Sequence, residues 1–271
     1  DAIGCTHNLS VMITEPDSIS LALIDKSVSC NGVCDGSIEA IISGGTQPYS
    51  ILWDDPGQTD SSYVDSLCAG QYSINIIDSN LCTVTKSDTI TEPSELIAFI
   101  GSHNNISCFG SNDGDASALG IGGTQPYSYL WSTADTTQLV SNLRPGLTSL
   151  EITDTNGCKS DTNVTILEPV LLVTSIIDTT HILCNGDSTG EATVRPTGGT
   201  APYTYNWFNT PINQTDSTAI KLPIGTYSVE VIDSNGCRDT STVTITEPTI
   251  LSASITNQVA TSCLVCDGEL S

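Results

Sequence analysis

The chain repeats one pattern three times, with a period of about 77 residues. The motif Gly-Gly-Thr-x-Pro-Tyr-x-x-x-Trp occupies residues 44–53, 122–131 and 198–207. A Glu-Pro pair recurs at residues 15–16, 92–93, 168–169 and 247–248. A unit of this length is long enough to hold its own strands, so the repeat predicts a string of small domains and not the turns of a solenoid.

The phase of the repeat predicts three full units, at residues 17–93, 94–169 and 170–248. Residues 1–16 match the end of a unit, because the stretch from Asp1 to Cys5 parallels that from Asp154 to Cys158. Residues 249–271 match the start of another. We therefore expect the chain to be an excerpt of a longer polypeptide, with any signal peptide or anchor outside it.

Apolar and polar residues alternate with a period of two inside each unit, for example over residues 37–42, 71–77 and 226–232. This alternation is typical of half-buried strands. Seven or so short strands with regular turn residues predict an all-β fold of tandem immunoglobulin-like β-sandwiches. Leu-x-x-Gly-x-Tyr at residues 67–72 and 222–227 fits the corner of such domains where a Tyr hydroxyl binds nearby backbone, whereas the second unit has Thr148 instead.

The composition restricts the partners of the chain. Seven Lys and Arg against 31 Asp and Glu give a net charge of −24, which argues against nucleic acid and acidic membrane surfaces. No apolar run reaches the length that spans a bilayer, so we expect no direct membrane insertion. Few charged residues and many Ser and Thr are typical of extracellular β domains.

Eleven cysteines recur at fixed phases of the repeat, which favours disulfides in an oxidising compartment. Zinc is the alternative, but it prefers two close pairs of cysteines, and the second and third units carry only isolated ones. A domain of this size is marginal alone, so we expect the disulfides to be structural. The candidates are Cys5, Cys30, Cys34, Cys68, Cys82, Cys108, Cys158, Cys184, Cys237, Cys263 and Cys266.

Two pairing schemes are open. Pairing within a unit joins Cys30 with Cys82 and repeats that bond in the next two units, whereas pairing across a joint joins Cys82 with Cys108 and its equivalents. The first is slightly favoured, although the two turns concerned lie at opposite ends of a seven-strand sandwich. Cys34 and Cys68 are better determined, because both are absent together from the second and third units. We expect them to be bonded, and Cys266 to have an equivalent partner.

Taken together, Cys-x-Gly, Asp-Gly, Gly-Gly-Thr-x-Pro-Tyr-x-x-x-Trp, Gly-x-Tyr-Ser-x-x-x-x-Asp-Ser-Asn and Thr-Glu-Pro resemble the SprB-repeat family over essentially the whole chain. The resemblance implies giant cell-surface adhesins of Bacteroidetes, including gliding-motility adhesins exported by the type IX secretion system. The same module also occurs in other secreted proteins of that phylum. It further implies O-glycosylation at Asp-Ser or Asp-Thr followed by an aliphatic residue or Thr. The sites are Ser18, Ser66, Thr89, Thr136, Thr179, Ser188 and Ser217.

Other candidate sites have simpler structural readings. Asp78, Asp154 and Asp233 recur at one domain end and are candidate calcium ligands, but Asp-Ser-Asn and Asp-Thr-Asn-Gly are also ordinary turns. The recurring Trp is a core anchor or a sugar-stacking platform, and the constant phase favours the core. Because the three histidines, His7, His103 and His181, have no recurring partner for a triad, we expect no enzyme and no required cofactor.

The sequence therefore favours a structural rod or stalk segment of a large cell-surface adhesin, with neighbouring repeats of the same chain as its partners. Two alternatives stay open. The repeats could themselves bind polysaccharide or a surface through the variable segments 54–66, 132–142 and 208–221, or they could be an accessory module of a secreted hydrolase.

Overall fold

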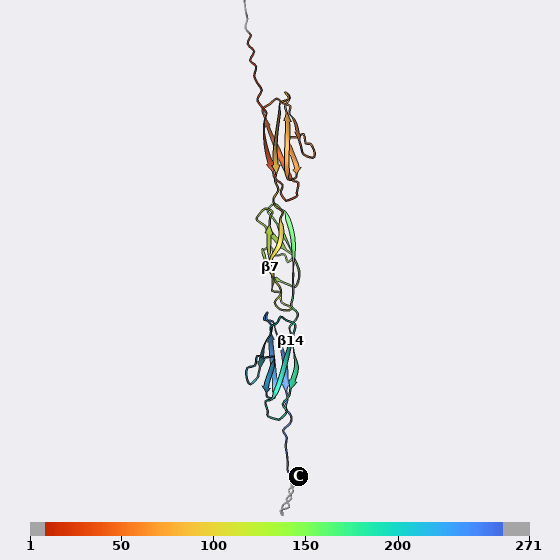
Figure 1. Cartoon of the computed structure of the whole chain (residues 1–271), viewed down its shortest axis with the longest axis vertical. Helices are drawn as coiled ribbons and strands as arrows, with labels where there is room; N and C mark the ends of the chain where they lie inside the picture. Colours follow the sequence, from red (N-terminus) through yellow and green to blue (C-terminus); the bar gives the residue numbers. More distant parts are fainter. Residues whose placement is uncertain (1–8, 257–271) are drawn as a thin grey trace, which may run out of the picture. The chain divides into compact units, whose positions relative to one another are not determined.

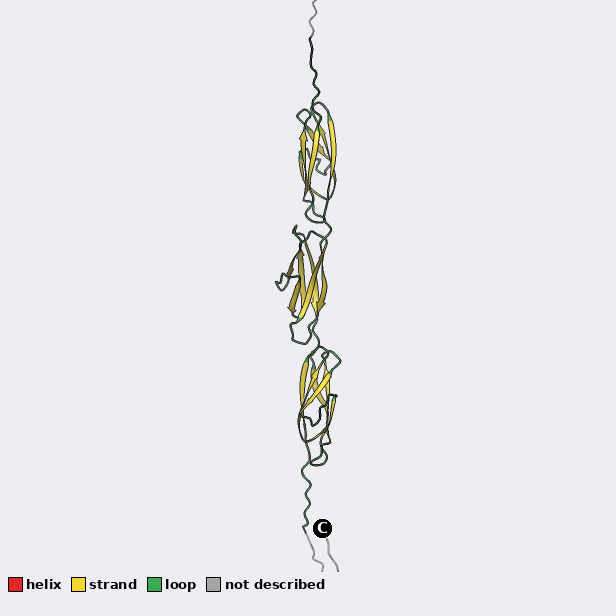
Figure 2. Cartoon of the chain, turned by 90° about the vertical axis from the view of Figure 1, so that its left-hand side faces the viewer, coloured by secondary structure: helices red, strands yellow, loops and turns green. Residues whose placement is uncertain are grey.

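The computed structural model describes residues 9–256. Four candidate site residues, His7 and the cysteines at positions 5, 263 and 266, lie outside this range. The described chain is all-β, and its strands fall into three sets that follow the repeat (Figures 1 and 2). No helix in this part of the chain is long and apolar enough to cross a membrane.

Each repeat contributes six strands in the same order. The first repeat holds β1 (Ser20–Lys26), β2 (Gly36–Ser43), β3 (Ser50–Trp53), β4 (Tyr63–Leu67), β5 (Gly70–Ile77) and β6 (Thr83–Ile90). The second holds β7 (Ile97–Asn104), β8 (Gly114–Ile121), β9 (Ser128–Trp131), β10 (Leu139–Leu143), β11 (Gly146–Thr153) and β12 (Lys159–Ile166). The third holds β13 (Val173–Thr180), β14 (Gly190–Thr197), β15 (Thr204–Phe208), β16 (Thr218–Leu222), β17 (Gly225–Ile232) and β18 (Arg238–Ile245).

Two three-stranded sheets form in every repeat. In the first, β2 lies between β1 and β4, and β5 lies between β3 and β6. The pairings are antiparallel, with Ile38 opposite Val64 and Trp53 opposite Ile74. The other repeats have the same strand orders, β7-β8-β10 with β9-β11-β12, and β13-β14-β16 with β15-β17-β18. This is the immunoglobulin-like sandwich that the alternating pattern predicts.

Each repeat has six strands, close to the seven or so that the sequence predicts. In the first repeat the segment between β3 and β4 contains no strand, because it holds Pro56 and Gly57 and forms a turn around Asp55. The Asp55 carboxylate accepts the N–H groups of Gly57 and Thr59 at 3.0 and 2.7 Å. Those backbone groups are bonded to a side chain and are not available to a sheet partner.

The core of each sandwich is built from the inward residues of both sheets. In the first repeat Ile38, Ile74 and Ile76 are fully buried, and Trp53 is 1% exposed. Trp131 and Trp207 are 1% and 3% exposed, so all three tryptophans are core residues and not exposed platforms. Each indole N–H donates to a backbone carbonyl of the segment that follows the Trp, at 2.8 to 2.9 Å.

Tyrosine hydroxyls fasten two turns in the repeat. Tyr49 donates to the carbonyl of Gly44 at 2.5 Å, which closes the Gly-Gly-Thr turn, and the equivalent bonds occur in the other repeats. At the predicted corner, Tyr72 donates to Cys68 at 3.1 Å and Tyr227 to Pro223 at 2.8 Å. The second repeat has a buried Thr148 there and lacks this corner bond, as its sequence indicates.

By their contacts, the described residues form two compact units, and the boundary between them runs through the second repeat. One unit comprises the residues up to His103 together with Ala116–Val140 and Leu147–Thr165. The other comprises Asn104–Asp115, Ser141–Gly146 and the described residues from Ile166 onward.

Candidate functional site

The first cysteine of each repeat sits in a turn between the first two strands, built from the same contacts three times. Backbone N–H groups donate to the cysteine carbonyls, from Val33 to Cys30 and from Ser111 to Cys108. The glycine of Cys-x-Gly donates its N–H to the glutamate of the Glu-Pro pair that ends the repeat. These bonds join Gly32 to Glu92, Gly110 to Glu168 and Gly186 to Glu247, at 2.6 to 2.9 Å. Cys-x-Gly and Glu-Pro, which are far apart in the sequence, therefore meet in one turn of each repeat.

The carbonyl that precedes this cysteine is held in place by the Asp-Gly pair in two of the repeats. The backbone N–H groups of Ser29 and Ser107 donate to Asp35 and Asp113 at 2.8 and 3.1 Å. The Ser107 hydroxyl also donates to Asp113, and these bonds hold the pKa of that carboxyl below its usual range. The fixed peptide places the serine carbonyl oxygen where another side chain can bind it.

The second recurring cysteine ends the Asp-x-x-x-Cys corner between the last two strands of each repeat. In the second repeat, Asp154 accepts the N–H groups of Asn156 and Cys158 at 2.9 Å on one oxygen and that of Thr124 at 2.8 Å on the other. Asp78 and Asp233 accept the equivalent three N–H groups. We call this arrangement the aspartate corner.

The aspartate corner is a backbone-binding turn, which is the simpler of the two interpretations of these residues. Bonds from the N–H groups of Thr46 and Cys82 hold the pKa of Asp78 below its usual value, so this carboxylate is charged at neutral pH. Asp78, Asp154 and Asp233 are 4%, 5% and 5% exposed. Among the described residues no group of three His, Cys, Asp or Glu side chains is placed to hold a metal ion.

Two disulfides join the cysteine turn of one repeat to the aspartate corner of the next. Cys30 is bonded to Cys158 and Cys108 to Cys237, with Cα atoms 5.7 and 5.5 Å apart. Cys30 and Cys158 belong to one compact unit, and Cys108 and Cys237 belong to the other. The bridges close 128 and 129 residues of chain and overlap in sequence, since Cys108 lies between Cys30 and Cys158.

An asparagine accompanies each of these disulfides. Asn156 donates its side-chain N–H to the Ser29 carbonyl at 2.9 Å, and Asn235 donates to Ser107 at 3.0 Å. Each asparagine also donates to the threonine hydroxyl of its own Gly-Gly-Thr turn, at 3.1 and 3.2 Å. We call the disulfide with this asparagine bond the cysteine joint.

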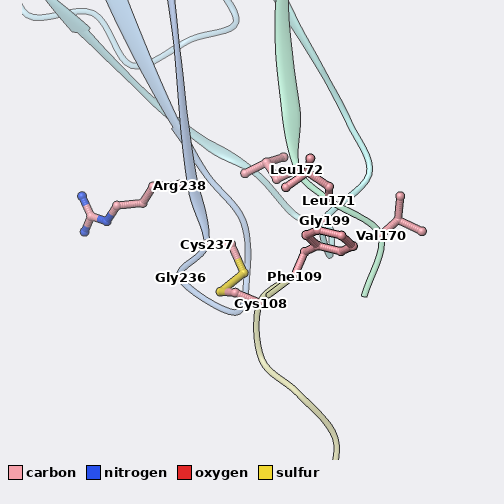
Figure 3. A pocket seen from close by; sticks show the side chains of 9 residues that line it. All are labelled: Cys108, Phe109, Val170, Leu171, Leu172, Gly199, Gly236, Cys237 and Arg238. Carbon is pink, nitrogen blue, oxygen red and sulfur yellow. A yellow bond between two sulfur atoms is a disulfide. The ribbon is translucent and has the colours of Figure 1, made fainter. Parts of the chain in front are cut away.

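The joint at Cys108–Cys237 borders a hollow of about 290 Å³ (Figure 3). The Phe109 ring lines it together with Val170, Leu171 and Leu172, so apolar side chains meet beside the disulfide. Arg238 points away from the hollow and binds Glu230, 3.0 Å away. A similar hollow of about 380 Å³ borders the other joint, with the smaller Asn31 in place of the phenylalanine.

The third disulfide joins Cys34 with Cys68 inside the first repeat. It connects the start of β2 with the turn after β4, two segments that pair in the sheet through Gly36 and Leu67. The sequence indicates the same pair, because both cysteines are absent from the other two repeats. An added Cβ on Gly36 would lie 2.8 Å from Ile90, so only glycine fits this crowded end of the strand.

The structure corrects both pairing schemes for the other cysteines. Cys30 and Cys82 lie at opposite ends of their sandwich. The turn that holds Cys30 leads into Gly36, which packs against Ile90, and Ile90 pairs with Gly70 at the start of β5. Cys82 instead follows Ile77 at the other end of β5. Eight strand residues span about 25 Å, far beyond the reach of a disulfide. A Cys82–Cys108 bond is also excluded. The turn cysteine of each repeat bonds to the corner cysteine of the following repeat, whereas Cys82 is a corner cysteine and Cys108 is the turn cysteine of the following repeat. Within the described residues Cys82 and Cys184 are unpaired and exposed.

Two functional residues escaped the sequence analysis. Asn156 and Asn235 bind a carbonyl of another repeat, and the glutamate of each Glu-Pro pair binds the cysteine turn of its own repeat, whereas the sequence alone indicates only turn and boundary residues. The signal was present, because both recur at a fixed distance from a cysteine. Only contact between different copies of the repeat reveals what the asparagine binds.

The remaining predicted sites are scattered. His103 is exposed, and His181 accepts the N–H of Thr246 at 3.2 Å, so these two histidines occupy separate structural positions. Five of the predicted glycosylation sites are exposed, and Thr179 and Ser217 are half-buried. The five exposed sites are Ser18, Ser66, Thr89, Thr136 and Ser188.

Fold and joint together define a class: tandem immunoglobulin-like sandwiches whose successive copies are bonded through recurring cysteines. The SprB repeat matches residues 25–58, 101–136 and 176–210. The chain therefore carries three repeats of the SprB family, which is a family of cell-surface modules found in gliding-motility adhesins of Bacteroidetes. No protein of curated function matches it.

Solved structures of several multidomain proteins resemble the chain at low identity. Three N-terminal domains of the bacteriophage RB49 outer capsid protein Hoc share 12% identity over 86% of this chain and 100% of that one, with a TM-score of 0.44. Immunoglobulin domains 1–5 of Sidekick-1 share 9% identity over 86% and 60% of the two chains, with a TM-score of 0.38. The S-layer protein rSbsC shares 10% identity over 91% and 42%, with a TM-score of 0.29.

Proposed function

We propose that this chain is a spacer segment of a large extracellular adhesin, in which sandwich repeats fastened end to end hold a binding part away from the cell. The observation that carries the proposal is the cysteine joint, which is built twice from the same residues at equivalent positions. A disulfide between repeats restricts the hinge that a bare linker would leave free. The overlap of the two bridges extends that restriction through all three repeats.

Family membership supports the same role. SprB repeats occur in surface adhesins that serve gliding motility, and we propose export by the type IX system and a part in surface attachment or gliding. The tryptophans are buried, and Asp55 and Gln214 are engaged in bonds within the variable segments, so these residues favour the spacer over a polysaccharide-binding module.

The first test is the solution shape of the chain. Strand and loop lengths give each sandwich a length of about 40 Å, so we expect the three repeats to span about 120 Å in small-angle scattering. Reducing the disulfides should broaden the distribution of distances, because the joints become hinges and the repeats lose the stabilisation that the bridges give. A compact particle, or freely jointed domains before reduction, would refute the spacer role.

We also propose that the Asp-Ser and Asp-Thr sites carry O-glycans in the native host. Bulky hydrated sugars would shield the open sheet edges of each sandwich from association, in a chain with few charged side chains. We expect the intact mass of protein from its native host to exceed that of the bare sequence, with sugars on the exposed sites named above. Protein made in a host that lacks this modification is the control. Equal masses would contradict the proposal.

A further inference from the structure

Cys82 and Cys184 occupy the same positions as the cysteines of the two joints. Cys82 ends the aspartate corner of the first repeat, as Cys158 and Cys237 do in the next two. Cys184 stands in the cysteine turn of the third repeat, as Cys30 and Cys108 do in the first two. Both thiols are exposed, whereas the four joint cysteines are half-buried. The described chain thus has one open half-joint of each kind.

The turn at Cys184 has the conformation of the two bonded turns. Asp187 donates its N–H to the Cys184 carbonyl at 3.2 Å, and Gly186 donates to Glu247 at 2.8 Å. Asn185 donates to the Pro248 carbonyl at 3.0 Å, as Asn31 does to Pro93. The turn differs in having Leu183 in place of the serine and Thr189 in place of the aspartate that binds the serine N–H. Only the carbonyl of the residue before the cysteine is needed for a joint. A backbone carbonyl is present whichever residue supplies it.

The corner at Cys82 also has the bonded conformation, with one donor unused. The Asn80 side chain donates to the Thr46 hydroxyl at 2.8 Å, which is the same internal bond that Asn156 and Asn235 make. Those two asparagines give their second N–H to a serine carbonyl of another repeat. Within the described residues Asn80 makes no such second bond. A hollow of about 320 Å³, lined by Ile19, Asp78 and Cys82, lies beside it.

We propose that Cys82 and Cys184 are complementary docking sites for further SprB repeats, so that the Cys184 turn of one copy of this chain bonds to the Cys82 corner of a second copy. The Asn80 N–H then donates to the Leu183 carbonyl. In the bond-forming step two thiols and a small-molecule disulfide, such as oxidised glutathione, give the Cys82–Cys184 disulfide and two molecules of the reduced small thiol. Such head-to-tail contacts generate open chains, or rings where the rotation between copies closes.

Two exposed leucines fit this arrangement. Leu81 is 81% and Leu183 is 84% exposed, and each directly precedes an open cysteine. Leu81 stands where the bonded corners have Gly157 and Gly236, and an added Cβ on either glycine would meet nothing within 4 Å. A side chain at this position is therefore compatible with a formed joint. Burying such leucines against a partner is favourable, because each exposes a large apolar surface.

The experiment mixes two forms of the full chain that carry serine in place of Cys5, Cys263 and Cys266. One form also carries Cys82→Ser and the other Cys184→Ser, so each keeps a single open half-joint. After incubation in a glutathione redox buffer, we expect the Cys82–Cys184 heterodimer to exceed either homodimer by about twentyfold, which is the statistical factor of about two multiplied by the factor of about ten that one hydrogen bond of about 1.4 kcal/mol gives. Non-reducing gels and peptide mapping measure the ratio. Random pairing, with about twice as much heterodimer as either homodimer, would overturn the proposal.

A second variant separates docking from simple thiol reactivity. Asn80→Ala should lower the ratio of heterodimer to homodimer about fivefold or more, because it removes the hydrogen bond to the carbonyl. Ser79→Ala, its exposed neighbour, is the matched control and should leave this ratio unchanged. Both variants should react with a small thiol reagent at the same rate as the parent. An Asn80→Ala variant that dimerises normally would also count against the joint. This test measures pairing preference and not shape, so it can succeed where the spacer role fails.

Discussion

Replacing Cys108 and Cys237 by serine should destabilise the third repeat by about 4 kcal/mol. The chain that joins this repeat to Cys108 is long. A disulfide that closes a loop of this size lowers the conformational entropy of the unfolded state and so stabilises the fold by about 4 kcal/mol. A sandwich of about 77 residues has little stability to spare, so local unfolding should become frequent. Hydrogen exchange resolved by repeat, together with thermal unfolding, measures the loss.

The matched control is the Cys34→Ser, Cys68→Ser double variant. It removes a disulfide of 34 residues inside the first repeat and should leave exchange in the third repeat unchanged. If the Cys108 and Cys237 variant left the third repeat as stable as the parent, the joint would not contribute to folding. A loss confined to the first repeat in both variants would contradict the pairing itself.

Trp207→Ala should cost the third repeat about 3 to 5 kcal/mol, enough to unfold it. The side chain is 3% exposed, packs in the core between the two sheets, and donates to the Asp216 carbonyl at 2.9 Å. Loss of the indole therefore leaves a large cavity and releases the segment before β16. Protease resistance and denaturant unfolding of the third repeat measure the effect.

Phe208→Ala is the control for that substitution. Phe208 neighbours Trp207 but is 42% exposed, so its truncation should cost about 0.5 kcal/mol or less. Trp207→Phe should fall between the two, because it keeps most of the buried area and loses the N–H donor. Equal effects of Trp207→Ala and Phe208→Ala would mean that the tryptophan is not the core anchor.

Much of the sandwich could be predicted from the sequence, because its causes are local. The alternation over residues 71–77 predicts β5 with Ile74 and Ile76 facing inward. The constant position of the Trp in each repeat predicts that it is buried. The bond of Tyr72 to Cys68 follows from the corner motif. The segment between β3 and β4 of the first repeat has no strand for an equally local reason, since the Asp55 carboxylate binds backbone N–H groups that a strand would use.

The partner of Cys30 could not be predicted in the same way. A repeat phase identifies which turn carries a cysteine, but every copy has the same phase, so the sequence cannot distinguish a partner in one repeat from its equivalent in the next. Cys34 and Cys68 escape this ambiguity because only the first repeat has them. The asparagine bond at the joint is hidden for the same reason, since its acceptor is a backbone carbonyl that any residue supplies.

The overlap of the two long bridges has a mechanical consequence. Under tension along the chain, a load that enters at Cys30 passes through sulfur to Cys158, runs back about 50 residues to Cys108, and crosses to Cys237. Even with all three sandwiches pulled apart, this covalent path extends to only about 170 Å, against about 700 Å for the same span without bridges. Under a sudden pull the repeats would therefore unfold only until this covalent path is fully extended, which sets a fixed maximum length.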